Sequence, residues 1–242
     1  MIPLVLVHGF LGGSAQWTGQ VEDLSDLCDI VTVDLPGFGA NAHLTPIASI
    51  GGMADWVLSE LSRQDLHRFH LLGHSMGGMI VQEMVTRASD RIETLILYAT
   101  SSLGVLPGRF ETIAQSKARA RADGPASTAK RIAATWFKDG ENATKYPACA
   151  EIACKASAAA IDAGLDAMEV WTGEATLPDI SVRCLIIWGD CDRTYKWDQI
   201  KRLWVDIPTT SIAVVPECAH AVHLERPELF NMHLRDWLSR TA

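Results

Sequence analysis

Short apolar segments alternate with amphipathic segments along most of this chain. The apolar segments are rich in β-branched residues and have no polar face, which is typical of strands buried on both sides of a sheet. The amphipathic segments repeat apolar residues at helical spacing, as Ile80 and Met84 do within Met76–Ala88. This alternation predicts an α/β fold in which helices cover both faces of a parallel sheet. The predicted strands are Ile2–Val7, Asp29–Asp34, Phe69–Gly73, Thr94–Ala99, Val182–Trp188 and Ser211–Val215.

The alternation is interrupted between the fourth and the fifth predicted strand. Residues 103–177 are rich in alanine and contain no convincing strand pattern. A long helical insertion between two strands of a sheet predicts a separate layer that covers the sheet edge. We therefore divide the chain into an α/β core of residues 1–102 and 179–242 and a helical cap of residues 103–178.

A candidate nucleophile follows the third predicted strand. Ligands of an open parallel sheet bind beyond the carboxyl ends of its strands, so catalytic residues are expected directly after strands. The sequence from Gly73 to Gly77 lies between a strand and a helix and fits the pattern G-x-S-x-G, with Ser75 at its centre. The serine of such a turn has unfavourable backbone dihedrals, and bulk at either glycine would clash. Ser75 is therefore the predicted nucleophile.

The loop after the first predicted strand is a candidate oxyanion hole. Acyl transfer passes through an oxyanion, which needs two preorganised hydrogen-bond donors. We expect the N–H of Met76, directly after the nucleophile, to supply one donor. We expect the N–H of Phe10, in the glycine-rich segment His8–Gly13, to supply the other.

Candidates for the acid and the base follow the last two predicted strands. Asp190 and Asp192 come directly after the fifth strand, and the order of residues alone does not choose between them. His220 and His223 follow the sixth strand. His220 lies nearer the strand end, so we assign it the role of general base and expect His223 to pack beside the last helix.

Several segments together resemble the α/β-hydrolase superfamily: VLVHGF, VDLPGFG, LLGHSMGG, LIIWGDCDR and CAHAVHLERPELF. The likeness covers essentially the whole chain and is nearest to small microbial esterases and lactonases of the 3-oxoadipate enol-lactonase type. The order Ser75, Asp192, His220 is the order of the catalytic triad in this superfamily. The resemblance implies that the acid lies three residues after Gly189, which selects Asp192 and leaves Asp190 as a turn residue that binds backbone N–H groups.

The resemblance also implies a fold and a reaction. The superfamily usually has a β-hairpin before the strand that precedes the HG pair, and this chain starts at that strand, so we expect about six parallel strands and no antiparallel edge. The implied reaction is cofactor-free hydrolysis of a carboxylic ester or lactone through an acyl-enzyme. Two alternatives stay open: hydrolysis of a carbon–carbon bond in a diketone-type ring-cleavage product, and a small-molecule receptor with slow turnover.

The predicted cap contributes candidates for contacts with the substrate. Large apolar side chains are expected either in the wall of the substrate pocket or in the packing of the cap itself: Trp136, Phe137, Met168 and Trp171. Basic side chains are expected either to meet a substrate carboxylate or, more simply, to form a solvated helix face. These are Arg109, Lys117, Arg119 and Arg121.

Composition narrows the possible partners. The net charge is −8, which disfavours nucleic acids and acidic lipid surfaces as partners. No apolar segment approaches the roughly 18 residues that span a bilayer, and no signal peptide is evident. The six cysteines form no C-x-x-C pair, so we expect reduced thiols in a cytoplasmic protein without a metal site. The expected partner is a small-molecule ester or lactone, and the oligomeric state is left open.

Overall fold

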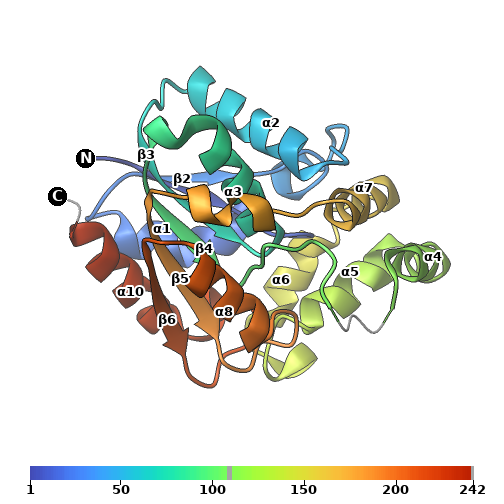
Figure 1. Cartoon of the computed structure of the whole chain (residues 1–242). Coiled ribbons are helices and arrows are strands. Elements are labelled where there is room, and N and C mark those ends of the chain that lie inside the picture. Colours follow the sequence, from blue (N-terminus) through green and yellow to red (C-terminus); the bar gives the residue numbers. More distant parts are fainter. Residues whose placement is uncertain (108–110, 241–242) are drawn as a thin grey trace.

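The computed structural model describes residues 1–107 and 111–240. Within these residues the sheet has six strands in the order β2-β1-β3-β4-β5-β6, and every pairing is parallel (Figure 1). The predicted α/β fold without an antiparallel edge is thereby confirmed, and the strand bounds differ from the predicted ones by one or two residues. The strands are β1 Leu4–Val7, β2 Ile30–Val33, β3 Phe69–His74, β4 Ile92–Tyr98, β5 Arg183–Gly189 and β6 Thr210–Val215.

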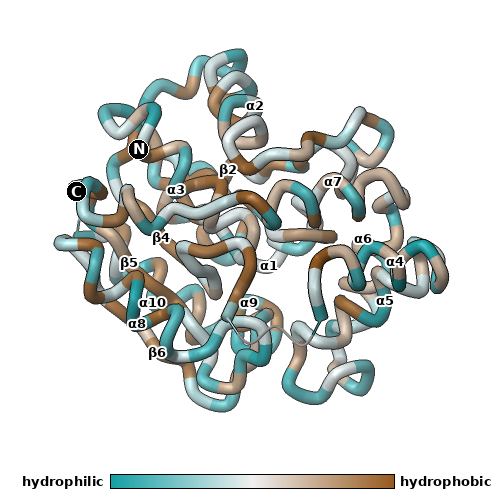
Figure 2. Tube along the Cα trace, turned by 45° about the vertical axis from the view of Figure 1, so that its right-hand side comes forward, coloured by the Kyte–Doolittle hydropathy of each residue, from teal (hydrophilic) through white to brown (hydrophobic). Residues whose placement is uncertain are grey.

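Helices cover both faces of the sheet. Alternate residues of each strand point to opposite faces. Leu71, Leu95 and Ile186 pack in the cluster that includes α2, α3 and α8, whereas Leu72 and Ile96 pack in the cluster that includes α1 and α10. The core helices are α1 Thr18–Leu24, α2 Ile50–Arg63, α3 Met76–Ala88, α8 Trp197–Asp206, α9 Val222–Glu225 and α10 Pro227–Ser239. Figure 2 shows the hydrophobic segments concentrated in the centre of the molecule.

The segment after β1 forms a short 3₁₀ helix before the first α-helix begins. Ser14 is of a residue type that caps helices, but its N–H and Oγ both bind the carboxylate of Asp34 at the end of β2, with distances of 2.9 and 2.6 Å. The hydroxyl is therefore unavailable for capping, and residues Ser14–Trp17 form a 3₁₀ helix before α1 begins at Thr18. By contrast, Ser49 caps α2 by accepting a hydrogen bond from the N–H of Gly52.

In the described part of the predicted cap there are four α-helices: α4 Ile113–Asp123, α5 Pro125–Ala134, α6 Tyr146–Ala153 and α7 Ala158–Glu169. The chain enters and leaves this region at one place, where Leu103 and Thr172 form an antiparallel bridge. A hydrogen bond of 2.8 Å from the N–H of Gly173 to the carbonyl of Ser102 closes the same junction. The next segment, Glu174–Asp179, packs against α8 of the core. We therefore propose that the cap ends near Gly173.

Among the described residues, no helix is both long enough and apolar enough to cross a membrane.

Candidate active site

Ser75 lies in a sharp turn between β3 and α3. Its backbone has φ 57° and ψ −120°, which an L-residue adopts only under strain. The turn is held by the N–H of Ser75, which donates to the carbonyl of Tyr98, and by Thr100 Oγ1, which donates to the carbonyl of Ser75 at 2.7 Å. A Cβ on Gly77 would lie 2.3 Å from the carbonyl oxygen of Val7, so only glycine fits there. The side chain of Ser75 thus stands at the carboxyl end of the sheet.

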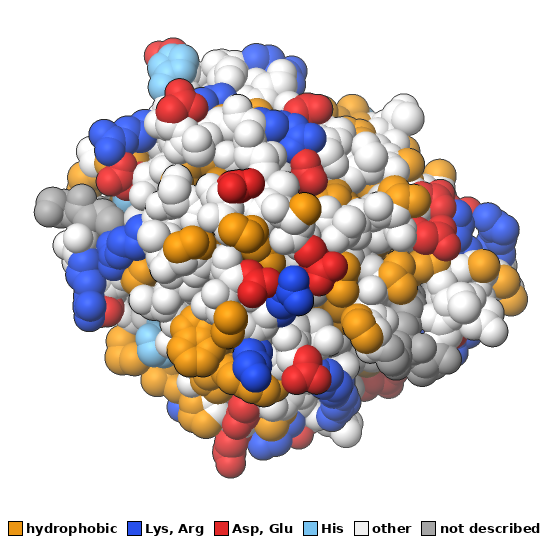
Figure 3. Space-filling view, viewed as in Figure 1, with side chains coloured by type: hydrophobic (Ala, Val, Ile, Leu, Met, Phe, Trp, Pro, Cys, Tyr) orange, Lys and Arg blue, Asp and Glu red, His pale blue; other side chains and the backbone are white. Residues whose placement is uncertain are grey.

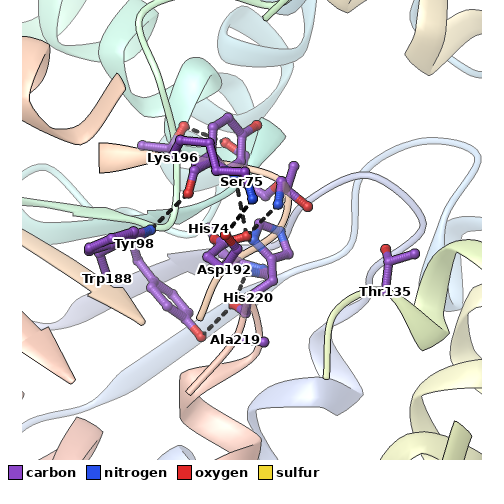
Figure 4. A network of polar contacts seen from close by, with 12 residues as sticks. His74, Ser75, Tyr98, Thr135, Trp188, Asp192, Lys196, Ala219 and His220 are labelled. Atoms are coloured by element: carbon purple, nitrogen blue, oxygen red, sulfur yellow. Dashed lines mark hydrogen bonds and ion pairs between the residues drawn. The ribbon is translucent and has the colours of Figure 1, made fainter. Parts of the chain in front are cut away.

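Asp192 and His220 are brought together from the ends of β5 and β6. Asp192 Oδ2 lies 2.9 Å from His220 Nδ1, and both side chains are almost fully buried. The second oxygen of Asp192 accepts the backbone N–H groups of Thr194 and Tyr195, at 2.7 and 3.2 Å. A buried carboxylate with all of these partners is held in one orientation. Figure 4 shows this pair and Ser75 in one polar network.

Asp190 does not behave as expected. It is exposed, and the described residues provide no backbone N–H bound to its carboxylate. Our expectation that Asp190 binds the N–H groups of its own turn was wrong, because Asp192 takes this role. The physical reason is burial: a carboxylate inside the protein needs every available donor, whereas an exposed one is solvated by water.

The glycine-rich loop after β1 approaches Ser75 closely. A Cβ on Gly9 would lie 2.8 Å from the Cβ of Ser75, so the next residue, Phe10, begins beside the candidate nucleophile. His8 holds this loop: its Nε2 accepts the N–H of Leu35 at 3.0 Å, which leaves Nδ1 to donate to the carbonyl of Gly9 at 2.7 Å. Burial lowers the pKa of His8, so the ring stays neutral in this role.

The N–H of Met76 lies at the first position of α3, directly after Ser75. The first N–H groups of a helix have no partner within the helix and lie at the positive end of its dipole. The N–H of Met76 thus adjoins Ser75 along the chain, and the loop that contains Phe10 approaches Ser75 in space. The role of these two residues in an oxyanion hole stays a prediction.

The four predicted pocket residues of the cap have different surroundings in the structure. Phe137 is fully buried and its ring contacts Tyr146, which places it in the packing of the cap. Trp136 is also buried, but its carbonyl accepts the N–H of Ala221, the residue after His220. The indole N–H of Trp171 donates to Glu83 on α3 at 2.8 Å. Met168 is buried within the same large cluster. Contact of these four side chains with a substrate stays a prediction.

Sequence analysis missed two residues behind the candidate base. His74 Nε2 and Tyr98 Oη both lie 3.1 Å from the backbone carbonyl oxygen of His220. His223 contacts Tyr98 as well, and its ring packs against Phe230 of α10, as predicted for a histidine beside the last helix. The signal in the sequence was weak, because His74 and Tyr98 occupy strand ends where any large side chain fits the pattern.

Comparisons with known proteins identify the family and the fold of the chain. The sequence pattern of the alpha/beta hydrolase family matches residues 4–232. The chain belongs to the alpha/beta hydrolase family. Its match to the protein named "Putative carbamate hydrolase RutD" from Agrobacterium fabrum is 28% identical and covers 98% of this chain and 93% of that protein.

Solved structures of this hydrolase family superpose on the whole chain. A thermophilic esterase from Thermogutta terrifontis has a TM-score of 0.89 at 25% identity, with 100% of this chain and 90% of the esterase covered. The enol-lactonase from Burkholderia xenovorans LB400 has the same fold, with a TM-score of 0.89 at 21% identity over 98% of this chain and 91% of the lactonase. These two solved structures share the fold of this chain, and the family match places the chain among hydrolases.

Proposed function

We propose that this hydrolase cleaves an uncharged carboxylic ester or lactone through a triad of Ser75, His220 and Asp192. The observation that carries the proposal is the 2.9 Å contact between Asp192 and His220 at the sheet edge where the strained turn presents Ser75. No step of the proposed reaction needs a cofactor. Within the described residues, no group of three or more acidic, histidine or cysteine side chains is arranged to hold a metal ion.

The first half of the proposed reaction forms an acyl-enzyme. His220 Nε2 takes the proton from Ser75 Oγ, and the oxygen attacks the carbonyl carbon of the substrate. The N–H groups of Phe10 and Met76 donate to the oxyanion of the tetrahedral intermediate. When the intermediate collapses, the bond to the leaving oxygen breaks, and His220 returns its proton to that oxygen.

The second half releases the acid. His220 takes a proton from a water molecule, whose oxygen attacks the acyl carbon, and the ester bond to Ser75 then breaks while His220 returns the proton to Ser75 Oγ. Asp192 accepts the hydrogen bond from Nδ1–H throughout. It thereby keeps Nε2 free to receive protons and stabilises the imidazolium that forms in each half.

An uncharged substrate is favoured by the basic residues of the cap. Lys117, Arg119 and Arg121 form ion pairs with Asp166, Glu111 and Asp162 respectively. A guanidinium or ammonium that is already paired within the cap is a poor partner for a substrate carboxylate. Figure 3 shows acidic and basic side chains next to one another over α4 and α7. Arg109, the fourth candidate, lies outside the described residues.

A panel of substrates tests the type of bond that is cleaved. It consists of a short aryl ester, an aliphatic lactone, an aryl carbamate and a vinylogous diketone, each assayed with the same enzyme preparation. We expect turnover of the ester and the lactone. Preferred cleavage of the carbamate would point to the activity in the name of the matched relative, and preferred cleavage of the diketone to a carbon–carbon hydrolase. Stoichiometric binding without turnover would point to a receptor.

The triad is tested at the nucleophile. Ser75→Ala is expected to lower kcat on the aryl ester by about 10⁴- to 10⁶-fold while leaving the melting temperature nearly unchanged. An aryl phosphonate should label Ser75 in the native enzyme, as read by mass spectrometry of the digested protein. Ser101→Ala, another buried serine after a strand, is the matched control and should keep the label and the activity. A fully active Ser75→Ala variant would refute the proposed nucleophile.

A further inference from the structure

The backbone carbonyl of His220 has two donors. His74 Nε2 reaches it from the end of β3 and Tyr98 Oη from the end of β4, each at 3.1 Å (Figure 4). His74 and Tyr98 are both buried. A carbonyl oxygen has two lone pairs, so both of its acceptor positions are occupied. Together with the bond to Asp192, these two hydrogen bonds tie the candidate base to the ends of three different strands.

The protons in this cluster can be assigned without conflict. Because a carbonyl only accepts, His74 carries its hydrogen on Nε2. Tyr98 has one proton, which goes to the carbonyl of His220. Its oxygen then accepts the N–H of His223 at 3.1 Å, and the 2.9 Å contact with His223 Nδ1 makes that nitrogen a donor as well. Each N–H or O–H hydrogen assigned here thus takes part in one hydrogen bond.

The donors keep these protons over the range of pH in which a hydrolase works. Burial and the neighbouring histidines hold the pKa of His74 well below its ordinary value. Burial lowers the pKa of His223 to about 3 and raises the pKa of Tyr98 well above its ordinary value. The ring of His74 also lies 4.5 Å from the ring of His220. A neutral ring at this distance adds no repulsion to the imidazolium that forms during the reaction.

We propose that His74 and Tyr98 are positioning residues that fix the main chain of the catalytic base, while Asp192 fixes its side chain. The inference rests on the triad proposed above. Because Ser75 follows His74 directly along the chain, the bond from His74 ties the backbone of the base to the strand that carries the nucleophile. The separation of Ser75 Oγ and His220 Nε2 is thereby set by β3 and β4 and does not depend on the loop after β6 alone.

Packing is the competing explanation for the same residues. The ring of Tyr98 stacks on His74 at 4.5 Å and contacts Phe230 at 4.8 Å, so both side chains also fill the core between the sheet and α10. A role in packing affects stability, whereas a role in positioning affects the rate at which Ser75 is acylated. The two explanations therefore differ in what each substitution changes.

Tyr98→Phe is the main test, because it removes the hydroxyl and keeps the ring. We expect kcat on an aryl ester to fall roughly 10- to 100-fold, since a small misplacement of a catalytic group has an effect of that size. KM should change less than about twofold, because the side chain of Tyr98 is fully buried. The rate of phosphonate labelling at Ser75 should fall by the same factor as kcat.

Two further variants sharpen the test. His74→Phe removes the other donor, and the double variant with Tyr98→Phe should lose more than the product of the single losses, since each single variant keeps one donor. Phe230→Leu is the matched packing control. It disturbs the contact with Tyr98 but no bond to His220, so its melting temperature should fall while kcat, measured well below that temperature, stays within about twofold.

The outcomes separate this inference from the triad on which it rests. If Ser75→Ala is inactive but Tyr98→Phe keeps full kcat and labelling rate, the positioning role is wrong and packing explains the cluster. The same conclusion follows if Phe230→Leu loses as much kcat as Tyr98→Phe. If Ser75→Ala keeps full activity, the triad is wrong and the inference fails with it. His74→Phe is not essential to this decision, because Tyr98→Phe alone separates the outcomes.

Discussion

The core and the cap are built in different ways. In the core, the central strands β1, β3, β4 and β5 are almost wholly buried, and Ser75, Asp192 and His220 lie just beyond strand ends. In the cap, alanine-rich helices such as α7 pack closely, and ion pairs such as Lys117–Asp166 and Arg121–Asp162 lie near the surface. Exposed ion pairs contribute only about 0–1 kcal/mol each to stability. The ion pairs therefore add little to the stability of the cap, whose buried side chains belong to the same apolar cluster as those of α3.

Some of the contacts between the two regions involve residues that lie close to the candidate site. The indole N–H of Trp171 donates to Glu83 on α3, and the carbonyl of Trp136 accepts the N–H of Ala221. The ring of Phe10 lies against Gly164 of α7. Changes in the core are thus expected to act on the chemistry itself, and changes in the cap to act through contacts of this kind.

After the loss expected at the nucleophile, the largest effect is expected at the acid, deep in the core. Asp192→Asn should lower kcat by up to about 10⁴-fold, because an amide favours the wrong tautomer of the histidine. Asp190→Asn, two residues away and exposed, is the matched control and should keep kcat within about twofold. Steady-state kinetics on an aryl ester measure both. A larger loss in Asp190→Asn than in Asp192→Asn would reverse our assignment of the acid while leaving the nucleophile untouched.

Acid should destabilise the core more than the cap. Every histidine of the chain lies outside residues 103–178. Below the ordinary histidine pKa of 6.5, His223 takes up a proton in the unfolded chain, but in the folded core it does so only near its lowered pKa of about 3. The unfolded state then binds more protons, so the free energy of unfolding falls with falling pH, by about 2 kcal/mol between pH 7 and 5 for this residue alone. The pKa of His74 is lowered in the same direction.

Urea unfolding at pH 7 and pH 5 measures this linkage. In His223→Gln the difference between the two pH values should shrink by about 2 kcal/mol, even though the variant is less stable at both. An equal pH dependence in the two proteins would mean that His223 is not neutral in the folded state.

The smallest effect is expected at the boundary between core and cap. A Cβ on Gly164 would lie 2.6 Å from the ring of Phe10, so Gly164→Ala should displace that ring and cost about 1 kcal/mol of stability. We expect kcat to fall only a few-fold, because the backbone of Phe10 moves less than its side chain. Gly19→Ala in α1 is the control: nothing lies within 4 Å of the added methyl group, and stability should rise slightly at unchanged kcat. Equal behaviour of the two variants would contradict a close contact at Gly164.

Much of this architecture was predictable from local patterns. The strand before Ser75 and the helix after it follow from the change of apolar spacing, and the two glycines mark the turn between them. The order of the chain then placed Ser75, Asp192 and His220 after strands. The assignment of Asp192 over Asp190 depended on the resemblance, because both residues follow the same strand and nothing in their neighbours indicates which carboxylate is buried.

Other features depend on contacts that the sequence does not encode locally. Ser14 and Asp34, which lie 20 residues apart, form a hydrogen bond that occupies the Ser14 hydroxyl and leaves it unavailable for capping a helix. His74 and Tyr98 meet the carbonyl of His220 across separations of 146 and 122 residues. Such partners are fixed by which strands become neighbours in the sheet. Periodicity predicts that strands exist, but the pairing of particular side chains across them requires the folded structure.

The single junction at Leu103 and Thr172 has an evolutionary and a practical consequence. Because the inserted segment starts and finishes at one antiparallel bridge, its length can change without altering the spacing of β4 and β5. The entropic cost of closing a longer loop grows only with the logarithm of its length, by about 0.6 kcal/mol for each doubling of the number of residues. We expect that the inserted segment can therefore vary while the pairing of β4 with β5 is kept. A foreign cap grafted between these two residues should preserve kcat only if it replaces the contacts that Trp136 makes with Ala221 and Gly164 makes with Phe10.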